Sequence, residues 1–133
     1  LAFLMPIVAS MGGNAGMQTL AVAVRTIATN DLTQNNFSSN VFKEFSIGIL
    51  NGIIFAAISA LIVQIWFQDS ILSLIIAISM VLTMIIAGLF GILVPFTLKK
   101  MNIDPAIASS VFVTTITDVI GFVSFLGVGA YFL

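Results

Sequence analysis

Two uncharged apolar runs in the middle of the chain decide its fold: 45-FSIGILNGIIFAAISALIVQIWF-67 and 71-ILSLIIAISMVLTMIIAGLFGILVPFTL-98. Each run exceeds the roughly 20 residues that a helix needs to cross the hydrocarbon core of a bilayer. Only Gln68, Asp69 and Ser70 separate them. So short a connection predicts an antiparallel hairpin of two membrane helices, in which Asp69 or Ser70 caps the second helix.

Two further apolar runs flank this hairpin, and each contains a single charged residue. Residues 1–29 contain Arg25, and residues 105–133 contain Asp118. The pair Asp104-Pro105 is a strong helix start, because a carboxylate caps the helix and proline suits its first position. The sequence therefore predicts an all-α fold, a polytopic transmembrane helical bundle in one domain over 1–133, with spans at about 1–29, 45–67, 71–98 and 105–133.

The composition agrees with a membrane protein and excludes several kinds of function. Of the 133 residues, 60% are hydrophobic and 7% are charged, whereas about one quarter of a water-soluble domain is charged. Four Lys and Arg residues cannot form the basic patch that nucleic acid requires. The absence of Cys and His excludes disulfides, zinc sites and Ser-His or Cys-His catalysis. An intramembrane aspartyl protease needs two acids in its spans and this chain has one, so we do not expect an enzyme.

The distribution of basic residues predicts the orientation in the membrane. Four spans place both termini on one side and the connections 30–44 and 99–104 on the other. All four basic residues fall on the side of these connections: Arg25, Lys43, Lys99 and Lys100. The only charged residue on the opposite side is Asp69. The positive-inside rule therefore predicts a multi-pass protein of the cell (inner) membrane, with external termini and cytoplasmic connections.

Asp118 is the residue that points most directly to a chemical role. It is the fourteenth of 29 residues in its predicted span, near the bilayer midplane, where an Asp costs about 2.5–3.5 kcal/mol on insertion scales. Helical spacing places four further residues on its face: Ile107, Ser110, Thr114 and Gly121. Because an intramembrane acid is by default a functional residue, we interpret this face as the lining of a cation pathway. A protonated structural acid and a proton carrier are the alternatives.

Small residues at helical spacing, such as Gly48 and Gly52, predict close helix packing. The segment 11-MGGNAG-16 is denser in glycine than packing requires, and exposed backbone carbonyls are good ligands for hard cations. Asn14 lies at a depth comparable to that of Asp118, where it either lines a pore or bonds a neighbouring helix. Spacing leaves two faces of this span open, one with Ser10, Asn14 and Gln18 and the other with Gly13, Met17 and Ala21.

The available ligands favour a hard cation. Without His or Cys, the donors are carboxylate, hydroxyl, amide and backbone oxygen, which suit Mg²⁺, Ca²⁺, Mn²⁺, Na⁺ or H⁺. One acid per chain is few for a dehydrated divalent ion, but a two-fold homodimer would bring two Asp118 carboxylates to a common axis. Mg²⁺ often keeps several waters, and a ring of two carboxylates around a hydrated ion suits that habit.

Two segments of the chain resemble membrane helices of the MgtE magnesium channel family. Residues 6–18, PIVASMGGNAGMQ, followed by Val24-Arg25, resemble its second membrane helix. Residues 104–106, DPA, and 112–122, FVTTITDVIGF, resemble its fifth. The spans between them have the expected spacing and hairpin, so the resemblance covers essentially the whole chain.

The resemblance implies a homodimer in the lipid bilayer, with five membrane helices per subunit and a pore along the dimer axis lined by the second and fifth helices. It implies that Asp118, in the pattern TTxTD, binds Mg²⁺ as the transported ion. The donor types by themselves also leave Mn²⁺ or Ca²⁺ possible. It favours Gly13 and Met17 as pore-facing, with Asn14 close by. The pore face of the last span then includes Ser110, Thr114 and Gly121.

Two departures from the family accompany the resemblance. The first membrane helix is missing, and so are the cytoplasmic magnesium-sensing regions, a helical domain and a paired CBS domain joined through a connecting helix. The chain starts at Leu1 with no basic segment before its apolar run, so we expect part of a longer protein rather than a signal peptide. Met17 is neutral where some relatives place a polar residue. The functional alternatives are a cation exchanger coupled to Na⁺ or H⁺, and a non-transporting scaffold with a structural Asp118.

Overall fold

Four long helices make up the computed structural model of the chain, which describes residues 4–28 and 37–132. In chain order they are α1 (Met5–Ala28), α2 (Phe37–Phe67), α3 (Ser70–Lys100) and α4 (Pro105–Phe132). All four are long and apolar enough to cross a membrane, and the described residues contain no strand. The prediction of an all-α chain with four membrane-spanning helices is confirmed.

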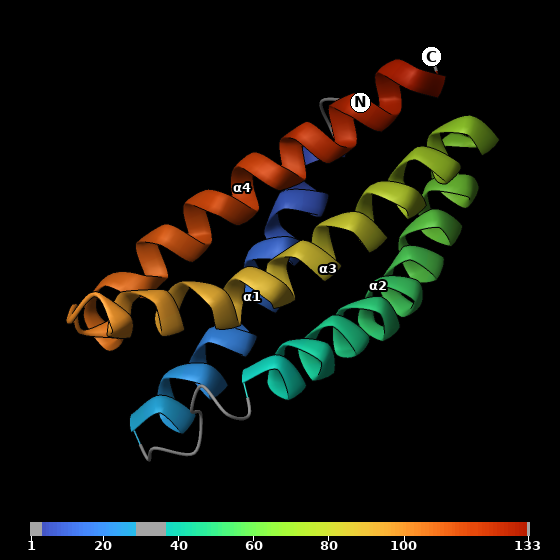
Figure 1. The fold of residues 1–133 in the computed structure, drawn as a ribbon. Coiled ribbons are helices and arrows are strands. Elements are labelled where there is room, and N and C mark those ends of the chain that lie inside the picture. Colours follow the sequence, from blue (N-terminus) through green and yellow to red (C-terminus); the bar gives the residue numbers. More distant parts are fainter. Residues whose placement is uncertain (1–3, 29–36, 133) are drawn as a thin grey trace.

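The α3 helix is the centre of the bundle, with α2 on one side of it and α4 on the other (Figure 1). It packs against each of the other three helices, and α1 also packs against α4. The start of α1, the end of α4 and the α2–α3 hairpin lie at one end of the bundle, and the α3–α4 turn lies at the other. The side chains of α3 that are fully shielded include Ile75, Met80 and Thr83.

The hairpin between α2 and α3 is closed by the expected cap. One carboxylate oxygen of Asp69 accepts hydrogen bonds from the backbone N–H groups of Ile71 and Leu72, at 3.0 and 3.2 Å. These N–H groups have no partner within the first turn of a helix, so the carboxylate satisfies them. Gln68, the residue before Asp69, adopts a left-handed backbone with φ of 52° and reverses the chain direction.

The second helix begins earlier than the sequence predicts. We expected residues 30–44 to connect the first two spans, whereas α2 already starts at Phe37. The prediction is therefore wrong for residues 37–44, and the part of the predicted connection at 30–36 lies outside the described residues. A helix satisfies its own backbone groups, so α2 can extend toward its N-terminus beyond the apolar run and include Lys43 and Glu44.

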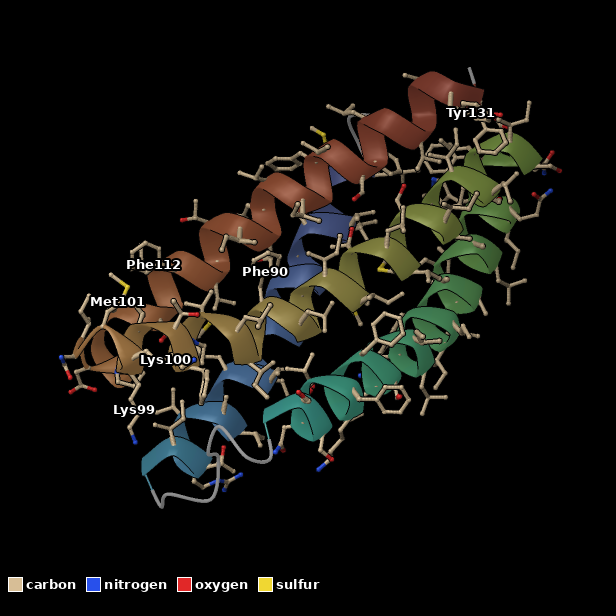
Figure 2. The ribbon with its side chains drawn as sticks, in the orientation of Figure 1. Phe90, Lys99, Lys100, Met101, Phe112 and Tyr131 are labelled. Atoms are coloured by element: carbon tan, nitrogen blue, oxygen red, sulfur yellow. The ribbon has the colours of Figure 1, made fainter. Side chains whose placement is uncertain are left out.

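Basic residues gather at one end of the bundle, in agreement with the prediction that they lie on one side of the membrane. Lys99 Nζ donates a hydrogen bond to the backbone oxygen of Ile27 at 3.3 Å, near the end of α1. Lys100 Nζ lies 5.0 Å from the centroid of the Phe96 ring. Figure 2 shows both lysines at the opposite end of the bundle from Tyr131. Arg25 is in the last turn of α1, at this same end.

Glycines bring the helix backbones into close contact, as predicted for Gly48 and Gly52. A Cβ atom added to Gly48 would lie 2.9 Å from the Cα atom of Ile85, and one added to Gly52 would lie 3.0 Å from the Cα atom of Val81. Such distances are shorter than real Cβ contacts, so α2 and α3 approach each other only because these positions lack side chains.

Candidate functional site

Asp118 lies halfway along α4, at the edge of the face that α4 turns toward the bundle. It is the fourteenth of the 28 residues of this helix and is half-buried. The buried side of α4 consists of residues at intervals of four: Ser109, Val113, Thr117, Gly121, Phe125 and Gly129. Because Asp118 follows Thr117, it is turned by about 100° from that buried row and lies beside it.

Three glycines allow α1 and α4 to pack closely around the level of Asp118. A Cβ atom on Gly121 would lie 2.9 Å from the Cα atom of Ala9, and one on Gly16 would lie 2.9 Å from Cγ1 of Val113. Gly13 is less tight, since its Cβ atom would lie 3.8 Å from the hydroxyl oxygen of Thr117. Gly121, which shares the predicted face with Asp118, is therefore buried in the contact with α1.

A shallow groove runs along the outer side of the α1–α4 contact and collects several of the predicted site residues. Thr114 Oγ1 donates a hydrogen bond to Met17 Sδ at 3.8 Å. The groove has a volume of about 240 Å³ and is lined by Met17, Leu20, Ala21, Val24, Pro105 and Ser110. We call this region, with Thr114, the α1–α4 groove.

The α1–α4 groove shows which face of the first helix meets α4. The face with Gly13, Met17 and Ala21 contacts α4. On the other face, Asn14 is exposed, and Gln18 lines a different cavity, which α2 and α3 complete. The side chain of Ile107 lies outside the described part of the chain.

Within the described residues, Asp118 is the carboxylate at the middle of a helix. The described residues contain no group of three or more His, Cys, Asp or Glu side chains that could hold a metal ion. Asp69 lies in the α2–α3 hairpin, and Asp104 directly precedes α4. Hydroxyl groups of α4 lie near Asp118 in sequence at Thr114 and Thr117, and the Met17 thioether of α1 is hydrogen-bonded to Thr114. These are weak ligands for a hard cation compared with carboxylates.

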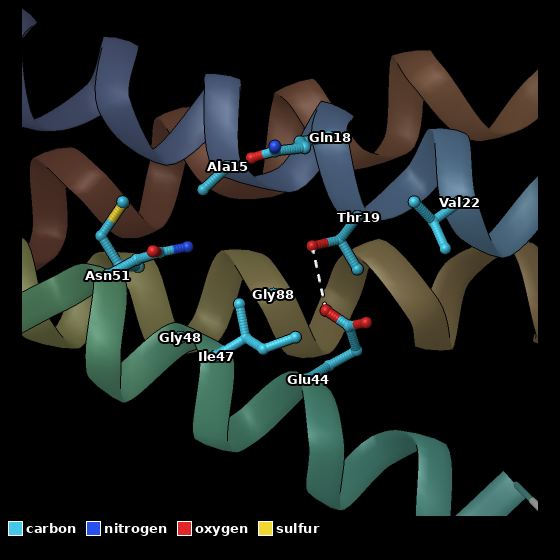
Figure 3. Close-up of a pocket in the computed structure, with 10 residues that line it drawn as sticks. Ala15, Gln18, Thr19, Val22, Glu44, Ile47, Gly48, Asn51 and Gly88 are labelled. Atoms are coloured by element: carbon cyan, nitrogen blue, oxygen red, sulfur yellow. Dashed lines mark hydrogen bonds between the residues drawn. The ribbon is translucent and has the colours of Figure 1, made fainter.

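A polar cavity between α1, α2 and α3 was missed by the sequence interpretation. Thr19 Oγ1 donates a hydrogen bond to Glu44 Oε2 at 3.3 Å, across this cavity (Figure 3). The sequence predicts Glu44 in a connection, because the pair Lys43-Glu44 interrupts the apolar pattern. The signal that could have located it is its spacing: Glu44, Gly48 and Asn51 fall on one face when the helix is extended toward the N-terminus.

Known proteins resemble this chain over its full length. A family profile named MgtE and described as a divalent cation transporter matches residues 5–128. The chain is 34% identical over 133 residues to the magnesium transporter MgtE of Bacillus subtilis (strain 168), covering all of this chain and 30% of that protein. It is 31% identical over 133 residues to the magnesium transporter MgtE of Enterococcus faecalis, and 33% identical over 135 residues to that of Thermus thermophilus; each match covers all of this chain and 29% of the relative.

The chain thus spans less than a third of the length of these curated relatives, in their C-terminal part. The motifs at 6–18 and at 104–106 with 112–122 lie inside the matched range, in or beside α1 and α4, which pack against each other. The profile match over residues 5–128 and the full-chain matches to these relatives show that the chain belongs to the MgtE family of divalent cation transporters.

Proposed function

We propose that this chain forms the ion pathway of a magnesium transporter, with the Asp118 carboxylate as its central ion site. The observation that carries the proposal is the position of Asp118: half-buried, halfway along α4, and one turn from the contact between Thr114 and Met17. The relatives named above are magnesium transporters. A carboxylate at this depth offsets the cost in hydration free energy when a cation leaves bulk water.

The proposed pathway needs a second copy of the chain. One Asp118 carries a single negative charge, whereas two carboxylates around a two-fold axis balance the charge of a divalent ion. Mg²⁺ gives up its waters reluctantly and commonly binds through one or two carboxylates while it keeps several waters. Two Asp118 side chains at a homodimer axis would bind such a hydrated ion, and Mn²⁺ and Ca²⁺, which also prefer oxygen ligands, would compete for it.

The lining of the pathway is proposed from the α1–α4 groove and its neighbours. Thr114 and Ser110 supply hydroxyl groups, Met17 and Gly13 supply a thioether and backbone, and Asn14 supplies an exposed amide. These groups would contact the water shell of the ion rather than the ion itself. Gly121 has a different role in this proposal, because its contact with Ala9 sets the distance between the two pore helices.

The orientation of the chain follows from its charges. The end of the bundle that carries Arg25, Lys99 and Lys100 faces the cytoplasm by the positive-inside rule, and the α2–α3 hairpin faces outward. The membrane is the cell (inner) membrane. Additional domains that sense magnesium would attach to this chain in the longer protein, consistent with the greater length of its relatives.

Mg²⁺ flux through the full-length protein tests the proposal. The protein is reconstituted in liposomes that contain a Mg²⁺ indicator, and a K⁺ gradient with valinomycin imposes the voltage. Asp118→Asn removes the charge and keeps the shape, so we expect the flux to fall by about tenfold or more, since each 1.4 kcal/mol of lost stabilisation is a factor of ten. Asp69→Asn makes the same chemical change in the hairpin and is expected to retain the flux of the unmodified protein.

The same assay separates the alternatives. Flux that follows the Mg²⁺ electrochemical gradient alone supports a channel, whereas a requirement for an opposing Na⁺ or H⁺ gradient identifies an exchanger. Undiminished flux in Asp118→Asn would contradict the proposed ion site. No flux in the unmodified protein, together with an unchanged melting temperature on adding Mg²⁺, would indicate a scaffold.

A further inference from the structure

The cavity between α1, α2 and α3 is separate from Asp118 and has the properties of a second ion site. Helices α1 and α2 each pack against α3, and the cavity fills the space between them (Figure 3). Its volume is about 340 Å³, and its polar lining residues are Gln18, Thr19, Glu44 and Asn51. Its remaining lining consists of Ala15, Val22, Ile47, Gly48, Met84 and Gly88.

The polar groups of this cavity are suited to a hard cation. Glu44 supplies a carboxylate, Thr19 a hydroxyl, and Gln18 and Asn51 amide oxygens. All of these are oxygen donors, the ligand type that Mg²⁺ and Mn²⁺ prefer. Among the described residues that line the cavity, Glu44 is the one with an acidic side chain and none is basic, so this lining favours a cation.

The Glu44 carboxylate retains capacity for further ligands. Within the described parts of the chain, its hydrogen bond comes from Thr19 Oγ1 at 3.3 Å, a long distance for a hydroxyl–carboxylate contact. An ionised carboxylate has about four acceptor positions on its two oxygens. Glu44 is half-buried, so a cation in the cavity would satisfy positions that the protein leaves open.

The cavity is wide enough for an ion that keeps its waters. Six waters occupy about 180 Å³ at their volume in liquid water, which is less than the cavity volume. Two of the lining residues, Gly48 and Gly88, have no side chain that would fill the cavity. A Cβ atom added to Gly88 would lie 3.3 Å from the backbone oxygen of Glu44. An ion bound here would contact Glu44 directly or through water, and the amides of Gln18 and Asn51 would bond its water shell.

The position of the cavity gives an aqueous ion access to it. Glu44 directly precedes the uncharged run at 45–67, seven residues after the start of α2. This is the level at which the apolar part of the helix meets its polar extension, at the basic end of the bundle. A carboxylate at such a boundary is less costly than one at the midplane, because headgroup water reaches it.

We propose that Glu44 and Thr19, with Gln18 and Asn51 around them, form a second site for a hydrated divalent cation such as Mg²⁺. The site joins α1 to α2, each of which also packs against α3. Because α1 also carries Gly13 and Met17 on its α4-facing side, an ion at Glu44 restrains the helix that faces Asp118. The existence of this site does not depend on the role of Asp118.

Equilibrium binding of Mn²⁺ to the full-length protein tests this site. Mn²⁺ takes the same oxygen ligands as Mg²⁺, and electron paramagnetic resonance measures the free ion. We expect Glu44→Gln to bind one Mn²⁺ fewer per chain than the unmodified protein, and excess Mg²⁺ to displace that ion. Lys43→Gln, a change at the neighbouring exposed position, is expected to keep all bound ions. An equal number of ions at equal affinity in Glu44→Gln and the unmodified protein overturns the proposal.

A second variant guards against a folding defect in Glu44→Gln. Thr19→Val keeps the shape of the side chain and removes the hydroxyl, so we expect the affinity of this one site to fall by about fivefold. Melting temperatures without divalent ions show that each variant is folded. Loss of the ion in Glu44→Gln beside normal flux in Asp118→Asn would leave this site standing while the proposed pathway fails. If Asp118→Asn loses flux while Glu44→Gln and Thr19→Val bind Mn²⁺ unchanged, the proposed pathway stands and the Glu44 site fails.

Discussion

Thr114 Oγ1 and Met17 Sδ meet at 3.8 Å and join α4 to α1 one turn before Asp118. In sequence these two residues are 97 positions apart, and in space they mark where the two helices with the family motifs approach each other. A hydroxyl to thioether hydrogen bond is weak, so the contact adds little stability. The contact instead marks the position of Thr114, which stays exposed beside α1.

Thr114→Val should lower Mg²⁺ flux without unfolding the protein. Valine keeps the shape of threonine but cannot hydrogen-bond the water shell of an ion, a loss of about 0.5–1.5 kcal/mol. This corresponds to a reduction of roughly 2- to 10-fold in liposome flux. Thr115→Val, at the adjacent exposed position on α4, is the control. Equal flux in both variants would contradict the proposal that Thr114 lines the pathway.

Gly121→Ala should destabilise the bundle, whereas Gly127→Ala should not. The added methyl group at position 121 would lie 2.9 Å from the Cα atom of Ala9, while nothing lies within 4 Å of one at position 127. Overpacking of this kind costs about 1–3 kcal/mol. Thermal unfolding in detergent micelles measures the difference between the variants. Equal melting temperatures would show that α1 and α4 are not in close contact at this level.

Asp69→Ala should loosen the start of α3. It removes the carboxylate that accepts hydrogen bonds from the N–H groups of Ile71 and Leu72, and loss of such a cap costs about 0.5–2 kcal/mol. Faster hydrogen exchange at these two amides is the expected result, while Asp69→Asn, which keeps an acceptor oxygen, should retain most of the protection. Unchanged exchange in Asp69→Ala would mean that the cap does not hold the first turn.

The orientation of the chain can be read with single cysteines, because the sequence contains none. Ser70 and Met101 are exposed; Ser70 is the first residue of α3 and Met101 directly follows its last, so they lie at opposite ends of this helix. A membrane-impermeant maleimide added to intact cells should label Ser70→Cys, and it should label Met101→Cys only after permeabilisation, since the basic end faces the cytoplasm. The reverse pattern would invert the proposed orientation.

Cross-linking between two chains tests the homodimer. In the proposed pathway, the α1–α4 groove faces the two-fold axis, so cysteines at position 114 of two chains should be joined by a short bifunctional maleimide. Ile58→Cys, at an exposed apolar position on α2, is the matched control and should yield monomers. Dimers formed equally from both variants would indicate random collision in the membrane.

Much of the architecture is predictable because the bilayer acts on length and charge. Hydrocarbon demands about 20 predominantly apolar residues per span, which locates four helices. The three residues at 68–70 leave only a hairpin between two of them. The start of α2 was predicted too late, because a charged pair was interpreted as a connection. Backbone hydrogen bonding does not depend on apolar side chains, so the helix includes Lys43 and Glu44 before its apolar run begins.

Part of the candidate site was likewise predictable from the sequence, and part was not. The sequence by itself determined that Asp118 lies midway along a helix, with hydroxyl groups at helical spacing, and that the motifs of two spans belong together. Spacing gives the angle between side chains on one helix but not the rotation of that helix against its neighbours. Only the tertiary structure decided that Gly121 is buried against Ala9, that Met17 rather than Asn14 meets Thr114, and that Glu44 reaches Thr19, because these contacts depend on how closely each pair of backbones can approach.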